Sequence, residues 1–170
     1  MARFRTSTST TNSLPPSGAY MLQVIDCTET VSTNGSDMFG LKFAIIPHDR
    51  YVYDFLVFNP NSFWVIADFC RSSGLELPEK AMDIDIYPND CMLRVCYAKL
   101  VHEVGKDGKT RLSVERYISR RQALGINPAL AQISAPENAP PPKKLQKAVG
   151  PLAVITTSQD TEVEQDDTPF

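Results

Sequence analysis

The chain has 170 residues, with 17 Lys or Arg against 20 Asp or Glu, and a formal net charge of −3. This length fits one domain with an appended segment, and no apolar run approaches the roughly 18–20 residues that a transmembrane helix needs. The charge is unevenly distributed: residues 94–121 hold eight basic and three acidic residues, a net charge of +5, whereas residues 126–170 account for the whole −3. A basic stretch followed by an acidic tail is typical of proteins with nucleic-acid partners.

Residues 1–17 are rich in Ser, Thr and Pro, which predicts a flexible arm. The β-branched and aromatic residues of 19–31 predict a strand that ends at an Asn34-Gly35 hairpin turn. Alternation predicts a second strand over 38–46, and a dense aromatic run predicts a third over 51–58. The arm lacks the apolar segment of a secretory signal, and the four cysteines form no C-x-x-C pair, so we expect a cytoplasmic protein with reduced thiols.

The period of the sequence changes after the third strand. Asn59-Pro60-Asn61-Ser62 is a helix-start cluster, and apolar residues then recur at helical spacing from Phe63 to Cys70. Gly74 is placed to end this helix. Trp64 lies beside the apolar stripe, and we expect it to pack against the sheet.

The second half of the domain reads as two more strands. A short alternating piece at Asp83–Ile86 precedes predicted strands over 91–104 and 110–118, which a tight turn at 105–109 joins. The order β-β-β-α-β-β predicts an all-β protein with the OB-fold, a five-stranded Greek-key barrel with one helix, over residues 18–121.

The remaining residues read as a tail in three parts. Residues 119–133 have room for a turn or two of helix, with Asn127-Pro128 as a start signal. The Pro-rich and polar composition of 122–159 predicts a disordered linker. Residues 160–170 carry five carboxylates and end on Phe170. An exposed ring among carboxylates predicts a ligand for a partner whose pocket has a basic rim.

The sequence at the C-terminus, Asp166-Asp167-Thr168-Pro169-Phe170, resembles the acidic tip of bacterial single-stranded DNA-binding proteins, although it has two adjacent aspartates and a threonine before the proline. The domain itself, with Gly18-Ala19-Tyr20, Val52-Tyr53-Asp54 and the following helix, is similar to small phage-encoded proteins of this type. The resemblance implies a protein that coats single-stranded DNA without sequence preference during replication, recombination or repair. It also implies that Asp166, Asp167, Pro169 and Phe170 recruit proteins of these processes.

Such a protein stacks aromatic rings on unpaired bases and pairs basic groups with phosphates. In an OB-fold the face of strands two and three and the loops joining strands one to two and four to five supply both. The candidate nucleic-acid-binding residues are Lys42, Tyr51, Tyr53, Arg94, Tyr97, Lys99, Lys106, Lys109, Arg111, Arg116 and Tyr117.

The third predicted strand has apolar or aromatic residues on both faces, so its alternation does not show which face is buried. Tyr51, Tyr53 and Phe55 share one face, whereas the other is formed by Val52, Asp54, Leu56 and Phe58. We expect Phe55 to be buried, and the hydroxyls of Tyr51 and Tyr53 to favour a wet edge.

Two other classes of function stay open. A protein-interaction module without nucleic-acid binding would explain the same domain, and Asp83 with Asp85 would be the start of a metal-dependent nuclease site. His48 and His102 stand alone without zinc-ligand spacing, and no phosphate-binding or nucleophile motif is present, so we expect no enzyme, metal or cofactor. The choice between DNA and RNA and the oligomeric state are also open, and we expect no membrane partner.

Overall fold

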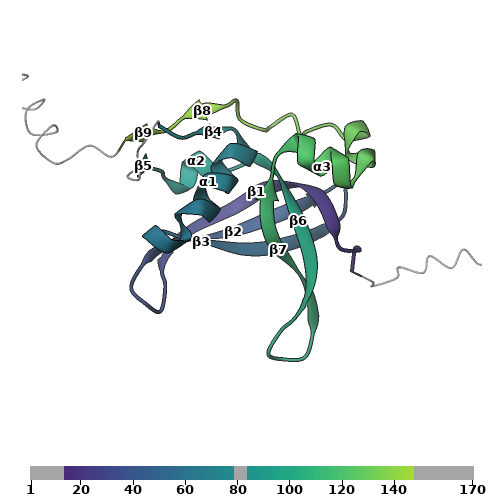
Figure 1. Cartoon of the computed structure of the whole chain (residues 1–170), viewed down its shortest axis with the longest axis horizontal. Coiled ribbons are helices and arrows are strands. Elements are labelled where there is room, and N and C mark those ends of the chain that lie inside the picture. Colours follow the sequence, from purple (N-terminus) through teal and green to yellow (C-terminus); the bar gives the residue numbers. More distant parts are fainter. Residues whose placement is uncertain (1–13, 79–83, 148–170) are drawn as a thin grey trace, which may run out of the picture.

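Five long strands form the centre of the protein. The computed structural model describes residues 14–78 and 84–147. The strands are β1 (Gly18–Val31), β2 (Asp37–Ile46), β3 (Arg50–Val57), β6 (Val95–Val104) and β7 (Thr110–Ile118). They form one antiparallel sheet in the order β3-β2-β1-β6-β7 (Figure 1), so the predicted all-β class is confirmed. The sheet is not closed into a barrel by any ladder among these strands, because β3 and β7 are its two edges.

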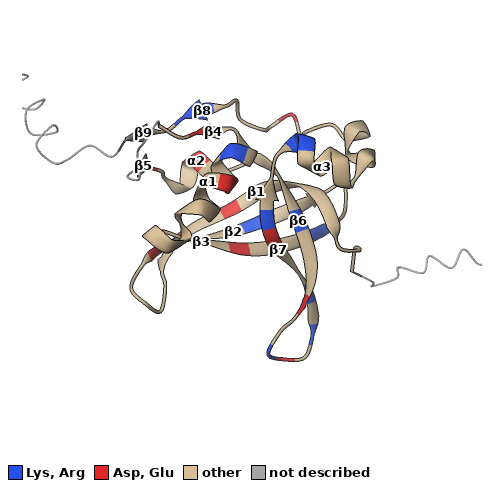
Figure 2. Cartoon of the chain, in the orientation of Figure 1, with Lys and Arg blue, Asp and Glu red and all other residues tan. Residues whose placement is uncertain are grey.

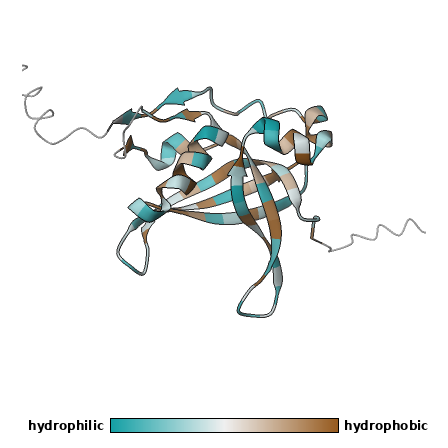
Figure 3. Ribbon diagram, in the orientation of Figure 1, coloured by the Kyte–Doolittle hydropathy of each residue, from teal (hydrophilic) through white to brown (hydrophobic). Residues whose placement is uncertain are grey.

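Side chains on one face of this sheet form the main core. Along the strands of the sheet, hydrophobic residues are interspersed with hydrophilic ones (Figure 3). The alternation predicted for β2 is observed, since Phe39, Leu41, Phe43 and Ile45 are all buried. The register pairs Phe43 with Val52 and Phe39 with Leu56, so these β3 residues point to the same side. The core side of β3 is therefore fixed by its pairing with β2.

The helix α1 (Phe63–Ser73) covers the core and follows a short 3-10 turn, η1 (Pro60–Ser62). The Asn59 side chain accepts a hydrogen bond from the Ser62 N–H at 2.9 Å, and Gly74 ends the helix in the left-handed conformation with φ of 80°. Phe69 of α1 packs edge-on against Tyr117, with ring centroids 5.2 Å apart. The predicted helix and both of its ends are confirmed.

Seven shorter elements complete the described residues. They are β4 (Leu75–Glu76), β5 (Ile84–Asp85), α2 (Pro88–Cys91), α3 (Arg120–Ile126), η2 (Pro128–Gln132), β8 (Lys143–Lys144) and β9 (Gln146–Lys147). Because residues 88–91 are helical, β6 begins later than predicted. In these residues no helix has the length and apolar character needed to span a membrane.

The helix α3 begins with a reciprocal cap. The Ser119 hydroxyl accepts a hydrogen bond from the Gln122 N–H at 3.1 Å, and the Gln122 side chain accepts one from the Ser119 N–H at 3.0 Å. A second apolar cluster fixes α3 and η2 against the opposite face of the sheet. It comprises Ala19, Met21, Ile118, Ala123 and Leu130.

Residues 134–147, which we call the C-terminal strap, return over the helices and pack as part of the domain (Figure 1). β8 pairs with β4, β9 pairs with β5, and Leu145 is only 3% exposed within the main core. The Leu145 N–H donates to the Glu76 carbonyl at 2.7 Å. The prediction of a disordered linker over 122–159 is therefore wrong for 122–147, because an apolar anchor and paired backbone groups offset the cost of ordering the segment.

The start of the described chain is also packed. Pro15 is buried, its carbonyl oxygen lies 2.6 Å from Nε2 of His102, and the Tyr20 hydroxyl donates to the Pro16 carbonyl at 2.5 Å. The prediction of a flexible arm over 1–17 is therefore wrong for residues 14–17, which pack against the domain. Residues 1–13 lie outside the described range.

Candidate nucleic-acid interface

The outer face of β3 carries a row of exposed aromatic rings. Tyr51 is 51% exposed, Tyr53 is 63% exposed and Phe55 is 56% exposed. The expectation that Phe55 is buried is wrong, because its partner in the register is Gly40 on the outer face of β2. A Cβ at Gly40 would lie 3.4 Å from the Phe55 ring, so the ring lies over the space that this glycine leaves.

A lysine lies beside the two tyrosines of this row. Lys42, which faces Tyr53 across the β2–β3 ladder, places Nζ 4.5 Å from the centroid of the Tyr51 ring and 5.8 Å from that of Tyr53. Cation–π attraction of this kind contributes about 0.5–1 kcal/mol at an exposed site. The rings and the cation together offer stacking surfaces next to a group that pairs with phosphate.

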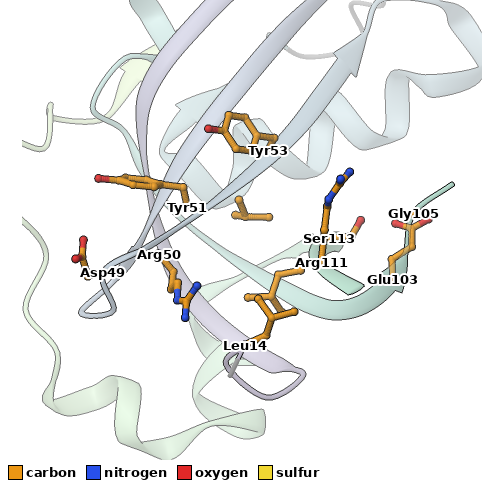
Figure 4. A pocket seen from close by; sticks show the side chains of 11 residues that line it. Leu14, Asp49, Arg50, Tyr51, Tyr53, Glu103, Gly105, Arg111 and Ser113 are labelled. Carbon is orange, nitrogen blue, oxygen red and sulfur yellow. The ribbon is translucent and has the colours of Figure 1, made fainter. Parts of the chain in front are cut away.

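The gap between the edge strands β3 and β7, which we call the seam, opens into a cavity of about 830 Å³ at the start of β3. Arg50, Tyr51 and Tyr53 line it from β3, and Arg111 lines it from β7 (Figure 4). Two acidic residues, Asp49 and Glu103, belong to the same lining. Two tyrosines and two arginines thus face one open cavity at the sheet edge.

Further along the seam, one hydrogen bond joins the two strands. The Tyr117 hydroxyl of β7 donates to the Asp54 carboxylate of β3 at 2.5 Å. Burial raises the pKa of Asp54, an effect that this hydrogen bond partly offsets. The pKa of Tyr117 is raised well above its usual range, first by burial and then by the nearby Asp54 charge. The bond divides the seam into the tyrosine end and a second end near α1.

Most of the predicted basic residues lie on the surface of β6, β7 and their hairpin (Figure 2). Lys106 and Lys109 are exposed in the turn. Arg111 pairs with Asp107, with Nη2 and Oδ2 2.5 Å apart, and Lys99 pairs with Glu115 at 2.9 Å. Arg116 is exposed near the second end of the seam.

Two predicted site residues are buried and are removed from the candidate interface. Tyr117 is 4% exposed, so its ring cannot present a face to a base. Arg94 is also 4% exposed, and it donates to the carbonyls of Asp90 at 2.6 Å and Pro141 at 3.1 Å. Burial lowers the pKa of Arg94. Its role is structural, because it ties α2 and the C-terminal strap together.

Two other aromatic residues differ from their predicted roles. Tyr97 is half-buried and packs with the second cluster beneath α3, away from the β3 rings. Trp64 was expected to pack inward and is instead 60% exposed. The buried face of α1 contains Ile66 and Phe69, and Trp64 lies outside that stripe.

The pairing of β2 with β3 is the signal that could have identified Phe55. The outer residues of β2 include Gly40 and Lys42, so any β3 residue that faces them is also outside. For Trp64 the signal was the helical spacing itself, since Trp64 lies outside the stripe of apolar residues that α1 buries.

The nuclease alternative gains nothing from the described residues, where no group of three His, Cys, Asp or Glu is placed to hold a metal ion. Asp85 belongs to β5, whereas Asp83 lies outside the described residues. The predicted partner-binding residues Asp166, Asp167, Pro169 and Phe170 lie outside them as well.

No protein-family model matches the chain, and neither does any curated protein sequence. The function is therefore inferred from the chemistry of the residues themselves.

Proposed function

We propose that this protein binds single-stranded DNA along the seam, through an OB-fold, and coats it without strong dependence on sequence. The observation that carries the proposal is the row of exposed rings on β3 with Lys42 beside it. Exposed aromatic rings next to basic groups are what unpaired bases and their phosphates require.

The arrangement of the elements supports the OB-fold assignment. β1 pairs with both β2 and β6, α1 lies between β3 and β6 in the chain, and β6 forms a hairpin with β7. The hydrogen bond from Tyr117 to Asp54 links the edge strands β3 and β7 by their side chains, which supports the partly open barrel of an OB-fold. The binding surface of an OB-fold includes the face of its second and third strands, where the rings lie.

The acidic tip completes the proposal. Phe170 and the carboxylates of 160–170 would recruit replication, recombination or repair proteins in the cytoplasm of a cell or of a phage host. Removing residues 160–170 should abolish such recruitment without removing any residue of the seam. A pull-down of host or phage replication proteins with the full chain and with the truncated chain tests this part separately.

A fluorescence titration with labelled oligo-dT at two salt concentrations tests the main proposal. Stacking contributes about 1–3 kcal/mol per base, so Tyr53→Ala should raise Kd by roughly 5- to 150-fold. The matched control is Tyr87→Ala, because Tyr87 is 62% exposed but stands before α2, away from the seam.

The other outcomes separate the remaining classes. No binding at low salt would refute the proposal and favour the protein-interaction module. Cleavage of the strand that requires Mg²⁺ would favour the nuclease. Equal losses in the Tyr53→Ala and Tyr87→Ala variants would show that binding does not use the β3 rings.

A further inference from the structure

The second end of the seam contains another hollow. Its volume is about 220 Å³, and β3, α1 and β7 all contribute to its walls. One water molecule occupies roughly 30 Å³ of the liquid, so the hollow has room for a small planar molecule. It lies beyond the hydrogen bond between Tyr117 and Asp54, opposite the tyrosine end.

Two exposed aromatic side chains line this hollow. Phe55 on β3 is 56% exposed, and Trp64 in the first turn of α1 is 60% exposed. Exposed apolar surface that gathers around one hollow, rather than being scattered singly, is typical of a ligand-binding groove. Phe55 also continues the row of Tyr51 and Tyr53, so a strand stacked on the tyrosines reaches this hollow next.

The polar groups around the rings are mainly hydrogen-bond acceptors. Asp68 of α1 and Glu115 of β7 line the hollow, as does Asp54 of β3, which already accepts the hydrogen bond from Tyr117. Asp68 pairs with Arg71 at 3.4 Å, and Glu115 pairs with Lys99 at 2.9 Å. An ionised carboxylate offers about four acceptor sites, so each of the two retains acceptor sites that its ion pair does not use. Arg116 is the cationic residue of the lining.

This combination discriminates between bases. Cytosine carries an exocyclic amino donor at N4, whereas thymine presents a carbonyl acceptor at the equivalent position. Carboxylates accept a hydrogen bond from the amino group and repel the carbonyl oxygen. Phosphates are also repelled by these carboxylates and would instead meet Arg116 at the rim.

We infer that the hollow between Phe55 and Trp64 is a base subsite that prefers an amino-bearing base over thymine. The inference rests on the proposed function, because the same bound strand has to occupy the tyrosine end. It adds a local preference to otherwise sequence-tolerant binding, set by Asp68 and Glu115.

The test compares labelled oligo-dC and oligo-dT of about 15 nucleotides, near the upper site size of one OB-fold. The wild-type protein should bind oligo-dC at least about fivefold more tightly. The double variant Asp68→Asn/Glu115→Gln should bind the two with nearly equal affinity, because an amide both donates and accepts. Trp64→Ala should weaken both oligonucleotides through lost stacking.

An exposed carboxylate outside the seam provides the control. Glu137→Gln removes an acidic group from the C-terminal strap, which lines neither cavity, and should leave the ratio of the two affinities unchanged. The four substituted positions have surface-exposed or half-exposed side chains, and far-UV circular dichroism verifies that each variant folds.

Equal affinity of the wild-type protein for oligo-dC and oligo-dT, with Tyr53→Ala still weakening both, overturns the subsite while the proposed function stands. A preference for oligo-dC that survives Asp68→Asn/Glu115→Gln overturns the role of these two carboxylates. If Trp64→Ala binds both oligonucleotides as tightly as the wild-type protein, the proposal that a base stacks on Trp64 is overturned. No binding of either oligonucleotide refutes the proposed function itself.

Discussion

Substitutions in the hairpin between β6 and β7 test contact with the phosphates most directly. Lys106 and Lys109 are both exposed there, and neither makes an ion pair with another described residue. Arg111 is a poorer choice, since its replacement would also release the carboxylate of Asp107. The lysine pair can therefore be neutralised without creating an unpaired acid.

Replacing both lysines with Gln should weaken the dependence of binding on salt. For single strands the log–log slope is about −0.7 per phosphate neutralised, so two lost contacts change the slope by roughly 1.4. Because of this difference in slope, the ratio of wild-type to variant affinity should fall about sevenfold when the salt concentration is raised from 50 to 200 mM. Titration of labelled oligo-dT across this range measures it directly.

Lys144→Gln is the matched control, because Lys144 is an exposed lysine on β8 in the C-terminal strap, away from the hairpin. Its slope should equal that of the wild-type protein. A slope unchanged by the Lys106→Gln/Lys109→Gln variant would show that the hairpin does not reach the phosphates. An equal change per charge in the Lys144→Gln variant would show that attraction is spread over the whole surface.

Two further predictions concern the fold. Leu145→Ala should lower the free energy of unfolding in urea by about 2–5 kcal/mol, the usual cost of truncating a buried leucine, whereas exposed Lys144→Ala should change it by less than about 0.5 kcal/mol. A negligible loss from Leu145→Ala would contradict the packed strap. Asp54→Asn should stabilise the protein at pH 7. Burial raises the pKa of Asp54, so the fold favours the neutral carboxyl, and the stability that this neutral form provides is lost as pH rises through the raised pKa. The gain should diminish as pH falls through the raised pKa of Asp54 and be gone below the ordinary carboxyl pKa of about 3.9; a pH-independent difference in unfolding free energy would refute this.

Local patterns in the sequence were enough to place most elements. The alternation of β2, the Asn-Gly turn and the start and end signals of α1 each act within a few residues, and the structure has all of them where they were expected. The faces of β3 required one more step, the register against β2, because β3 has aromatic residues on both sides. Without that step Phe55 was assigned to the core.

Long-range contacts account for the residues that were misplaced. Tyr117 is buried because its hydroxyl meets Asp54, which lies on a strand far away in the chain. Arg94 is buried because it donates to carbonyls near α2 and in the strap. In both cases the residue type suggested a nucleic-acid contact, whereas the partner that satisfies it becomes visible only once the chain is folded.

The same contacts change the meaning of the +5 stretch. Of its eight basic residues, Arg94 is buried and both Lys99 and Arg111 are paired with acids. Near the seam and the β6–β7 hairpin, three basic residues of the stretch make no ion pair with another described residue: Lys106, Lys109 and Arg116. The attraction that the seam offers to phosphate is therefore smaller than the sequence total suggests. Under the proposed function a larger share of the affinity must come from the β3 rings, whose stacking depends little on salt.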